Sequence, residues 1–229
     1  MHLKQYKQEA NTPGQASMDD SFFKELAENL GIITKVKYVF ITQCQREVTP
    51  DCVDTIAFWS KGKIIDNIRY ALYDTPCEDV LKGNIRFYSE RLQALFPEDE
   101  DLQALDAESY LGCPIFSSSG NILGHIAILN TIPLENEREL IAIIKAFASM
   151  ARSEFERNQA IEINKIILEN SLDAFIAINT KGKITNWNKQ AKKIFGWCEK
   201  EVLGNELYKF IVPRGQKTAH KNGIKRIMK

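Results

Sequence analysis

The sequence is poor in the residues and patterns on which most catalytic and metal sites are built. It has three histidines, spread along the chain as His2, His125 and His220. It contains neither a GxxxxGK[ST] nor a GxGxxG phosphate-binding loop, and no HExxH or CxxC pattern. A histidine-dependent hydrolase or a metal site would have to draw on scattered residues. The sequence therefore predicts a protein that is not an enzyme.

Cysteine pairs and long apolar segments are also missing. The five cysteines are an odd number with no pair two or three residues apart, which fits neither a disulfide framework nor a zinc knuckle. No apolar run approaches the roughly 18 residues of a membrane span, and the N-terminal segment lacks the apolar stretch of a signal peptide. We therefore expect a cytoplasmic protein without a membrane segment, in which residues 1–18 form a flexible leader.

The net charge is zero, but the two signs are unevenly distributed. Residues 171–229 carry 13 lysine and arginine residues against 4 acidic ones, a net charge of +9, which leaves −9 for the rest. Such asymmetry indicates two units, and it makes nucleic-acid binding a candidate function of the basic unit. Its lysines are scattered over predicted turns and helix surfaces without a recognition-helix arrangement, which favours a solvated surface.

Residues 19–157 alternate between helical and strand-like patterns. An amphipathic helix is predicted to begin at a cap near Asp19 and to stop at Gly31. The middle of this region is irregular, with short helices expected after Thr75 and after Phe96. Runs rich in β-branched and aromatic residues predict strands and two hairpins at 36–45, 53–59, 64–65, 109–116 and 122–132.

The segment 136–170 contains neither glycine nor proline and is predicted to form one helix. Four of its apolar residues follow steps of four, three and four, as in a coiled-coil seam: Leu140, Ile144, Phe147 and Ala151. At 1.5 Å per residue the helix would be roughly 50 Å long, too long to serve one small domain. We interpret 137–170 as a connector helix and expect a homodimer through the helix 136–170.

A third hairpin is predicted after this helix, from strands at 174–179 and 184–187 around Gly182. Short helices are expected to follow it at 189–195, 199–203, 207–212 and 219–228.

Several motifs in the first region carry a family resemblance. They are Thr75–Leu81, Leu95–Pro97, Ala107–Ile115 and Gly120–Ala127. In this order they resemble the GAF modules found before PAS, histidine-kinase or cyclase units in bacterial sensors. The resemblance implies an α+β fold, with a GAF-like antiparallel sheet flanked by helices over residues 19–157, and a role in signal transduction.

The basic region resembles the first half of a PAS domain. The matching segments are Ser171–Ile176, Gly182–Asn188, Ala191–Trp197 and Glu201–Gly204. PAS domains continue past a segment like Phe210–Pro213 with one long helix and three more strands. The resemblance therefore implies an incomplete, PAS-like α+β unit at 171–229, loosely packed alone or completed by a partner chain.

Five residues are candidates for a GAF ligand pocket between the sheet and the irregular middle: Phe58, Trp59, Cys77, Phe87 and Tyr110. The aromatic residues could equally fill the core. Cys77 has two interpretations. It lies at a predicted helix start, where the helix dipole could lower the pKa of its thiol, and it could also be a plain structural cysteine. His125 is interpreted as a hydrogen-bonded core residue. The residues around Cys77 do not match a bilin-attachment pattern, and the sequence indicates no particular cofactor.

The predicted function is that of a cytoplasmic signal-sensing module of the kind used in two-component regulation. It would bind a small ligand or a partner and transmit the event through a dimeric connector helix. The alternative is a ligand-free interaction or dimerisation module, and the third interpretation is nucleic-acid binding by the basic region.

Overall fold

A computed structural model describes residues 20–44 and 52–227. The predicted leader, 1–18, lies outside the described residues. The chain divides after Asn158 into two compact units, which we call unit 1 (up to Asn158) and unit 2 (from Gln159). The long helix between them therefore belongs partly to each unit.

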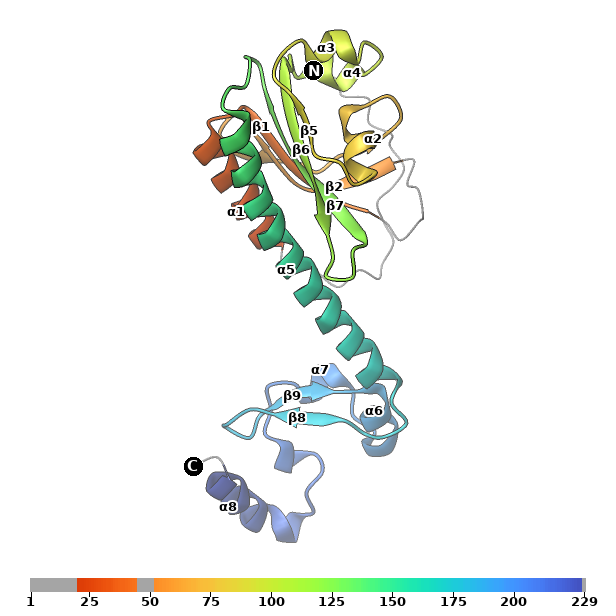
Figure 1. The fold of residues 1–229 in the computed structure, drawn as a ribbon. Helices are drawn as coiled ribbons and strands as arrows, with labels where there is room; N and C mark the ends of the chain where they lie inside the picture. The colour runs from red at the N-terminus through yellow and green to blue at the C-terminus, as the bar shows by residue number, and fades with distance from the viewer. Residues whose placement is uncertain (1–19, 45–51, 228–229) are drawn as a thin grey trace. The chain divides into compact units, whose positions relative to one another are not determined.

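Unit 1 is built on a seven-stranded antiparallel sheet (Figure 1). The strand order is β3-β2-β1-β7-β6-β5, and β4 pairs with β2 beside β3. The strands are β1 (Tyr38–Gln43), β2 (Cys52–Ser60), β3 (Lys63–Ile65), β4 (Arg69–Ala71), β5 (Arg86–Tyr88), β6 (Ser109–Phe116) and β7 (Ile122–Asn130). Both predicted hairpins, β2–β3 and β6–β7, are confirmed. The short strands β4 and β5 were not predicted, because they lie in the middle region whose sequence pattern is irregular.

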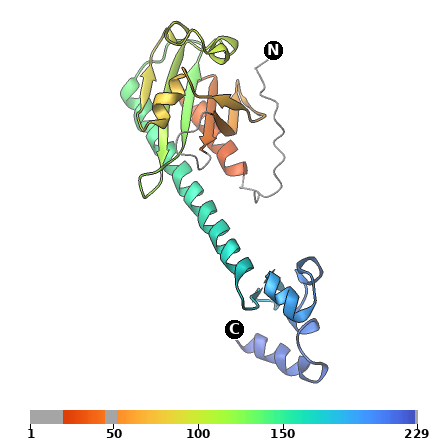
Figure 2. The same ribbon diagram turned by 90° about the vertical axis from the view of Figure 1, so that its right-hand side faces the viewer.

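Helices cover both faces of this sheet (Figures 1 and 2). The α5 face is covered by α1 (Asp20–Thr34) and by the first half of α5 (Glu137–Asn170). The α2 face is covered by three short helices, α2 (Pro76–Leu81), α3 (Leu92–Leu95) and α4 (Glu100–Ala104). Because both faces are buried, the central strands are apolar at almost every position.

The strand alternation distributes neighbouring residues between two separate cores. In β1, Val39 and Ile41 lie in the core under the α5 face, whereas Tyr38 and Phe40 lie in the core under the α2 face. On the α5 face the two helices also contact each other, with the ring centroids of Phe23 and Phe155 4.8 Å apart. Unit 1 is thus a three-layer structure with an apolar core on each side of the sheet.

The prediction that α1 stops at Gly31 is wrong, because the helix continues to Thr34. A β-carbon at Gly31 would lie 2.5 Å from the Trp59 ring. The glycine therefore lets β2 approach the helix closely rather than ending it.

The predicted helix at 136–170 is confirmed, but its apolar seam is not free for another chain. Leu140, Ile144 and Ala151 are buried in the core under the α5 face, and Phe147 packs against the same core. A helical apolar pattern looks the same whether it faces its own sheet or a partner helix. Most of the apolar residues left exposed lie further along, at Ile161, Ile163, Ile166 and Ile167, whereas Met150 is exposed within the first half of the helix.

Unit 2 contains the hairpin of β8 (Ile176–Ile178) and β9 (Ile184–Trp187), as predicted. The hairpin is followed by α6 (Lys189–Phe195), α7 (Glu199–Val202), two 3-10 turns (Leu207–Lys209 and Arg214–Gln216) and α8 (Lys217–Ile227). The helix expected at 207–212 is therefore only a short turn. Four residues are buried in the core of this unit: Ile184, Trp187, Ala191 and Val202.

Candidate functional site

The structure divides the five predicted pocket residues between the two faces of the sheet. Phe58, Cys77 and Tyr110 lie in the core under the α2 face, each at most 3% exposed. Trp59 and Phe87 pack against the core under the α5 face. Phe58 and Trp59 are adjacent in β2, so their side chains must point in opposite directions. Because successive side chains of a strand point to opposite faces of the sheet, the sequence already indicated that these two residues could not line the same pocket.

A chain of buried polar side chains runs through the core under the α2 face, and its first part centres on His125. The imidazole Nδ1 lies 2.7 Å from the Thr42 hydroxyl and Nε2 lies 3.2 Å from the Tyr70 hydroxyl. Burial lowers the pKa of His125 from 6.5 to about 3, so the ring is neutral at pH 7. A neutral ring donates through one nitrogen and accepts through the other. His125 is therefore a satisfied core residue, as predicted.

This chain of buried polar side chains continues from Tyr70 to Cys77 and Tyr110. Both tyrosine side chains hydrogen-bond the Cys77 thiol, and the Tyr110 hydroxyl donates to Sγ over 3.3 Å. Gly112 makes room for this arrangement, because a β-carbon there would collide with the Tyr110 hydroxyl and the Val80 side chain. The partners satisfy one another in series from Tyr110 to His125, which is what a polar group inside an apolar core requires.

This environment keeps the Cys77 thiol protonated. Burial raises its pKa to about 12, although the two tyrosine hydrogen bonds act in the opposite direction. A thiol with such a pKa carries almost no thiolate at pH 7, and the thiolate is the reactive form. The structure thus favours the structural cysteine over the activated one, because burial outweighs any effect of the α2 N-terminus.

A cavity of about 410 Å³ lies among α2, β5 and the segment that follows α3. It is lined by Asp74, Thr75, Glu78, Asp79, Tyr88, Leu95, Phe96, Pro97 and Glu98. We call it the acidic cavity. The Tyr88 and Phe96 rings meet edge to face at 5.3 Å. Carboxylates combined with aromatic rings suit an organic cation of metabolite size.

Two of the carboxylates in the acidic cavity are already paired. Glu78 accepts from the Lys82 ammonium at 2.7 Å, and Asp79 pairs with the Arg86 guanidinium at 2.8 Å. Asp74 and Glu98 have no ion pair with any residue in the described part of the chain. The cavity therefore keeps excess negative charge.

Solved structures share the architecture of unit 1. The GAF domain of a two-component sensor histidine kinase from Bacillus halodurans aligns over 64% of this chain and 99% of its own, with a TM-score of 0.52 and 16% identity. The PixJ GAF domain of Thermosynechococcus elongatus, in its blue-light absorbing form, aligns over 65% of this chain and 91% of its own, with a TM-score of 0.50 and 14% identity.

Unit 1 has the GAF fold. Residues 164–226 match the family model of the PAS fold, so a PAS-like region follows the GAF domain, as the sequence motifs implied. No curated protein matches the chain. At these identities the neighbours establish the fold of the GAF domain and nothing about its ligand.

Sequence reasoning missed most of the polar surroundings of the GAF core. Thr42 and Tyr70 lie 83 and 55 residues from His125 in the chain, so only the sheet brings them together. The acidic cavity had a local signal in the turn prolines Pro76 and Pro97, each followed by acidic residues.

Within residues 20–44 and 52–227, no group of three or more histidine, cysteine or acidic residues could hold a metal ion. In the same segments, no helix has the length and apolarity to cross a membrane.

Proposed function

We propose that this chain is a non-catalytic signal-sensing regulatory module. In it, the GAF domain takes up a small ligand or a partner, and α5 passes the event on within a homodimer. The observation that carries the proposal is the change of environment along α5. Its first half is part of the GAF core up to Phe155, and its second half carries exposed apolar residues into the PAS-like region.

The exposed apolar residues of α5 include a stripe suited to a partner helix. Ile163, Ile166 and Ile167 are spaced by three and four residues, so they lie on one side of the helix. They are 45%, 51% and 60% exposed. Exposed apolar stripes of this kind mark protein interaction sites. We therefore place the dimer contact after Asn158, in 159–170, rather than along the whole of 136–170.

Two observations support the sensory part of the proposal. The structures that share the fold include the GAF domain of a sensor histidine kinase and a light-absorbing GAF domain. The acidic cavity is contributed partly by α2, which packs on the sheet opposite α5. An organic cation bound there would change the packing of a layer that shares the sheet with the transmitting helix. A cytoplasmic location and a role in two-component regulation remain predictions of the sequence.

The dimer is tested by the oligomeric state of the full chain over a wide concentration range, by analytical ultracentrifugation. The double variant Ile163→Glu/Ile166→Glu is expected to be monomeric, because buried carboxylates would face each other across the contact. The variant Ile161→Glu places the same change about half a turn away and is expected to remain dimeric. A wild-type chain that is monomeric throughout, or equal effects of the two variants, would contradict the proposal.

The alternative is an interaction or dimerisation module without a small ligand. A thermal-shift assay with putrescine and choline separates the two, because a ligand that binds only the folded state raises the melting temperature. The shift should be lost in Glu98→Gln and retained in Glu100→Gln, since Glu100 does not line the cavity. A dimer with no thermal response would favour the ligand-free module.

A further inference from the structure

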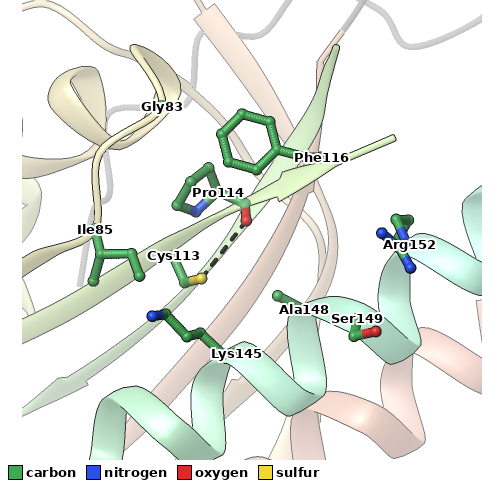
Figure 3. Close-up of a pocket in the computed structure, with 9 residues that line it drawn as sticks. All are labelled: Gly83, Ile85, Cys113, Pro114, Phe116, Lys145, Ala148, Ser149 and Arg152. Atoms are coloured by element: carbon green, nitrogen blue, oxygen red, sulfur yellow. Dashed lines mark hydrogen bonds between the residues drawn. The ribbon is translucent and has the colours of Figure 1, made fainter. Parts of the chain in front are cut away.

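A second cavity lies beside α5 at the end of β6 (Figure 3), and the charged residues that line it are cations, in contrast to those of the acidic cavity. Its volume is about 280 Å³, and its walls come from three segments: 83–85, the end of β6, and the middle of α5. We call it the basic cavity. This volume lies just below the usual range of ligand cavities, roughly 300–1,000 Å³, and so suits only a small metabolite.

The basic cavity exists because β6 continues past the end of its neighbour. The pairing between β5 and β6 ends at Arg86 and Gly112. Beyond this point the preceding chain turns away at Gly83, which has a φ of +99°. Three of the last four residues of β6, Cys113, Pro114 and Phe116, therefore border an open space beside α5.

The walls formed by β6 and its neighbouring segment are apolar. Ile85, Pro114 and Phe116 line them, together with the Cys113 thiol (Figure 3). Burial raises the pKa of Cys113 to about 11 in spite of the nearby Lys145, so the thiol is neutral. No aspartate or glutamate lines the cavity.

The wall formed by α5 supplies two cations, Lys145 and Arg152, with Ser149 between them. Neither cation has an ion pair with a residue of the described chain. The Nε of Arg152 is buried and donates to no atom of residues 20–44 and 52–227. A buried donor without a partner costs about 1–3 kcal/mol, so such a group needs an explanation.

Two acidic residues follow Arg152 within about one turn of the helix, and neither forms an ion pair with it. Glu154 pairs with Arg157, and Glu156 accepts a 2.6 Å hydrogen bond from the backbone N–H of Ser118, at the turn between β6 and β7. This bond lowers the pKa of Glu156 more than the attraction of Arg152 does. The Arg152 guanidinium therefore retains hydrogen-bonding capacity at the edge of an apolar space.

We propose that the basic cavity binds a small organic carboxylate with an apolar body. The carboxylate would accept hydrogen bonds from Arg152 and Ser149, because the guanidinium fork matches carboxylate geometry. The body would lie along Ile85 and Phe116, and Lys145 would add a second positive charge. Three of these contacts come from α5, the helix that also carries the proposed dimer contact. The binding test nevertheless depends neither on the dimer nor on the acidic cavity.

The test uses the full chain with benzoate and hexanoate as probes, measured by calorimetry, and the uncharged benzyl alcohol and hexanamide as controls. The carboxylates are expected to bind and their uncharged counterparts to bind at least tenfold more weakly. Arg152→Gln should weaken carboxylate binding about tenfold or more. The matched control Arg138→Gln removes an exposed arginine of the same helix outside the cavity and should leave binding unchanged.

Two further measurements locate the binding. Ser149→Phe fills the basic cavity from an exposed position of the helix and should abolish binding without loss of helical signal. Bound carboxylate should slow the alkylation of Cys113 but not that of the exposed Cys52.

Four results would overturn the proposal. They are no carboxylate binding at all, equal binding of the uncharged analogues, equal losses in Arg152→Gln and Arg138→Gln, and inorganic phosphate binding as tightly as the carboxylates. The last result would indicate a simple anion site that makes no use of the apolar walls.

Discussion

The two units of this chain are stabilised in different ways. Unit 1 covers both faces of a seven-stranded sheet and buries a large apolar core on each side. Unit 2 has a two-stranded sheet and four buried core residues. Small units bury a smaller fraction of their apolar surface, so single interactions matter more in them. The comparison indicates that unit 2 depends on hydrogen bonding where unit 1 depends on packing.

One side chain organises unit 2. Asn188 is fully buried, and its Oδ1 accepts from the backbone N–H groups of Phe175 and Ala191, both at 2.9 Å. Its Nδ2 donates to the backbone oxygens of Leu168 and Asp173, at 2.8 and 3.0 Å. All four hydrogen-bonding positions of the amide are therefore used, and they join the end of α5, the segment just before β8 and the start of α6.

The largest effect is expected from Asn188→Ala. It leaves four backbone groups without their partner, at about 1 kcal/mol or more each, for a total of about 3–5 kcal/mol. We expect unit 2 to lose cooperative folding while unit 1 stays folded, and hydrogen exchange resolved by peptide would show this. The matched control is Asp99→Ala, which removes the N-cap of α4 in unit 1 and should cost about 1 kcal/mol. If Asn188→Ala and Asp99→Ala had equal, small effects, the two units would not differ in their dependence on single hydrogen-bonding side chains.

An intermediate effect is expected within α5, where the two units meet along one helix. Ile144→Ala removes a fully buried side chain from the GAF core and should lower the free energy of unfolding of unit 1 by about 3 kcal/mol. Ile161→Ala changes a side chain that is 53% exposed and should alter that free energy by less than about 0.5 kcal/mol. Urea unfolding followed by circular dichroism measures both. A large effect of Ile161→Ala on unit 1 would show that GAF packing extends past Asn158.

A smaller effect should appear in the pH dependence of unit 1. The folded pKa of His125, about 3, lies below its ordinary value of 6.5, so the unfolded state takes up the proton first as the pH falls. His125 therefore does not affect stability above pH 6.5 and destabilises the fold progressively below it, by about 2 kcal/mol at pH 5. His125→Gln should reduce this dependence between pH 7 and pH 5. An unchanged slope would contradict a buried, neutral histidine.

Asp99 provides a control of opposite sign. Burial raises its folded pKa from 3.8 to about 6, so the folded state binds the proton more tightly. This carboxyl therefore lowers stability as the pH rises from about 4 to about 6, and its effect is constant above that range. Asp99→Asn should change the pH profile in the direction opposite to His125→Gln.

Much of the local structure of both units could be predicted from the sequence. Runs rich in β-branched and aromatic residues, separated by glycine-containing turns, predicted the three hairpins, and the segment without glycine or proline predicted α5. These features depend on neighbours in the chain, which the sequence shows directly. The same holds for the motifs that indicated a GAF domain followed by a PAS-like region.

The sequence alone could not decide which partner each apolar or polar side chain would meet. Leu140 and Ile144 pack on their own sheet, and Phe58 and Trp59 separate onto opposite faces. Burial of apolar surface is non-directional, so an apolar pattern does not name its partner.

Only the tertiary structure placed His125 beside Thr42 and Tyr70, or Arg152 beside the end of β6. The sequence by itself determined most of the helices and strands and indicated a GAF domain followed by a PAS-like region. The fold determined the buried polar chain and both cavities, because these are made of residues far apart in the chain that only strand pairing and helix packing bring together.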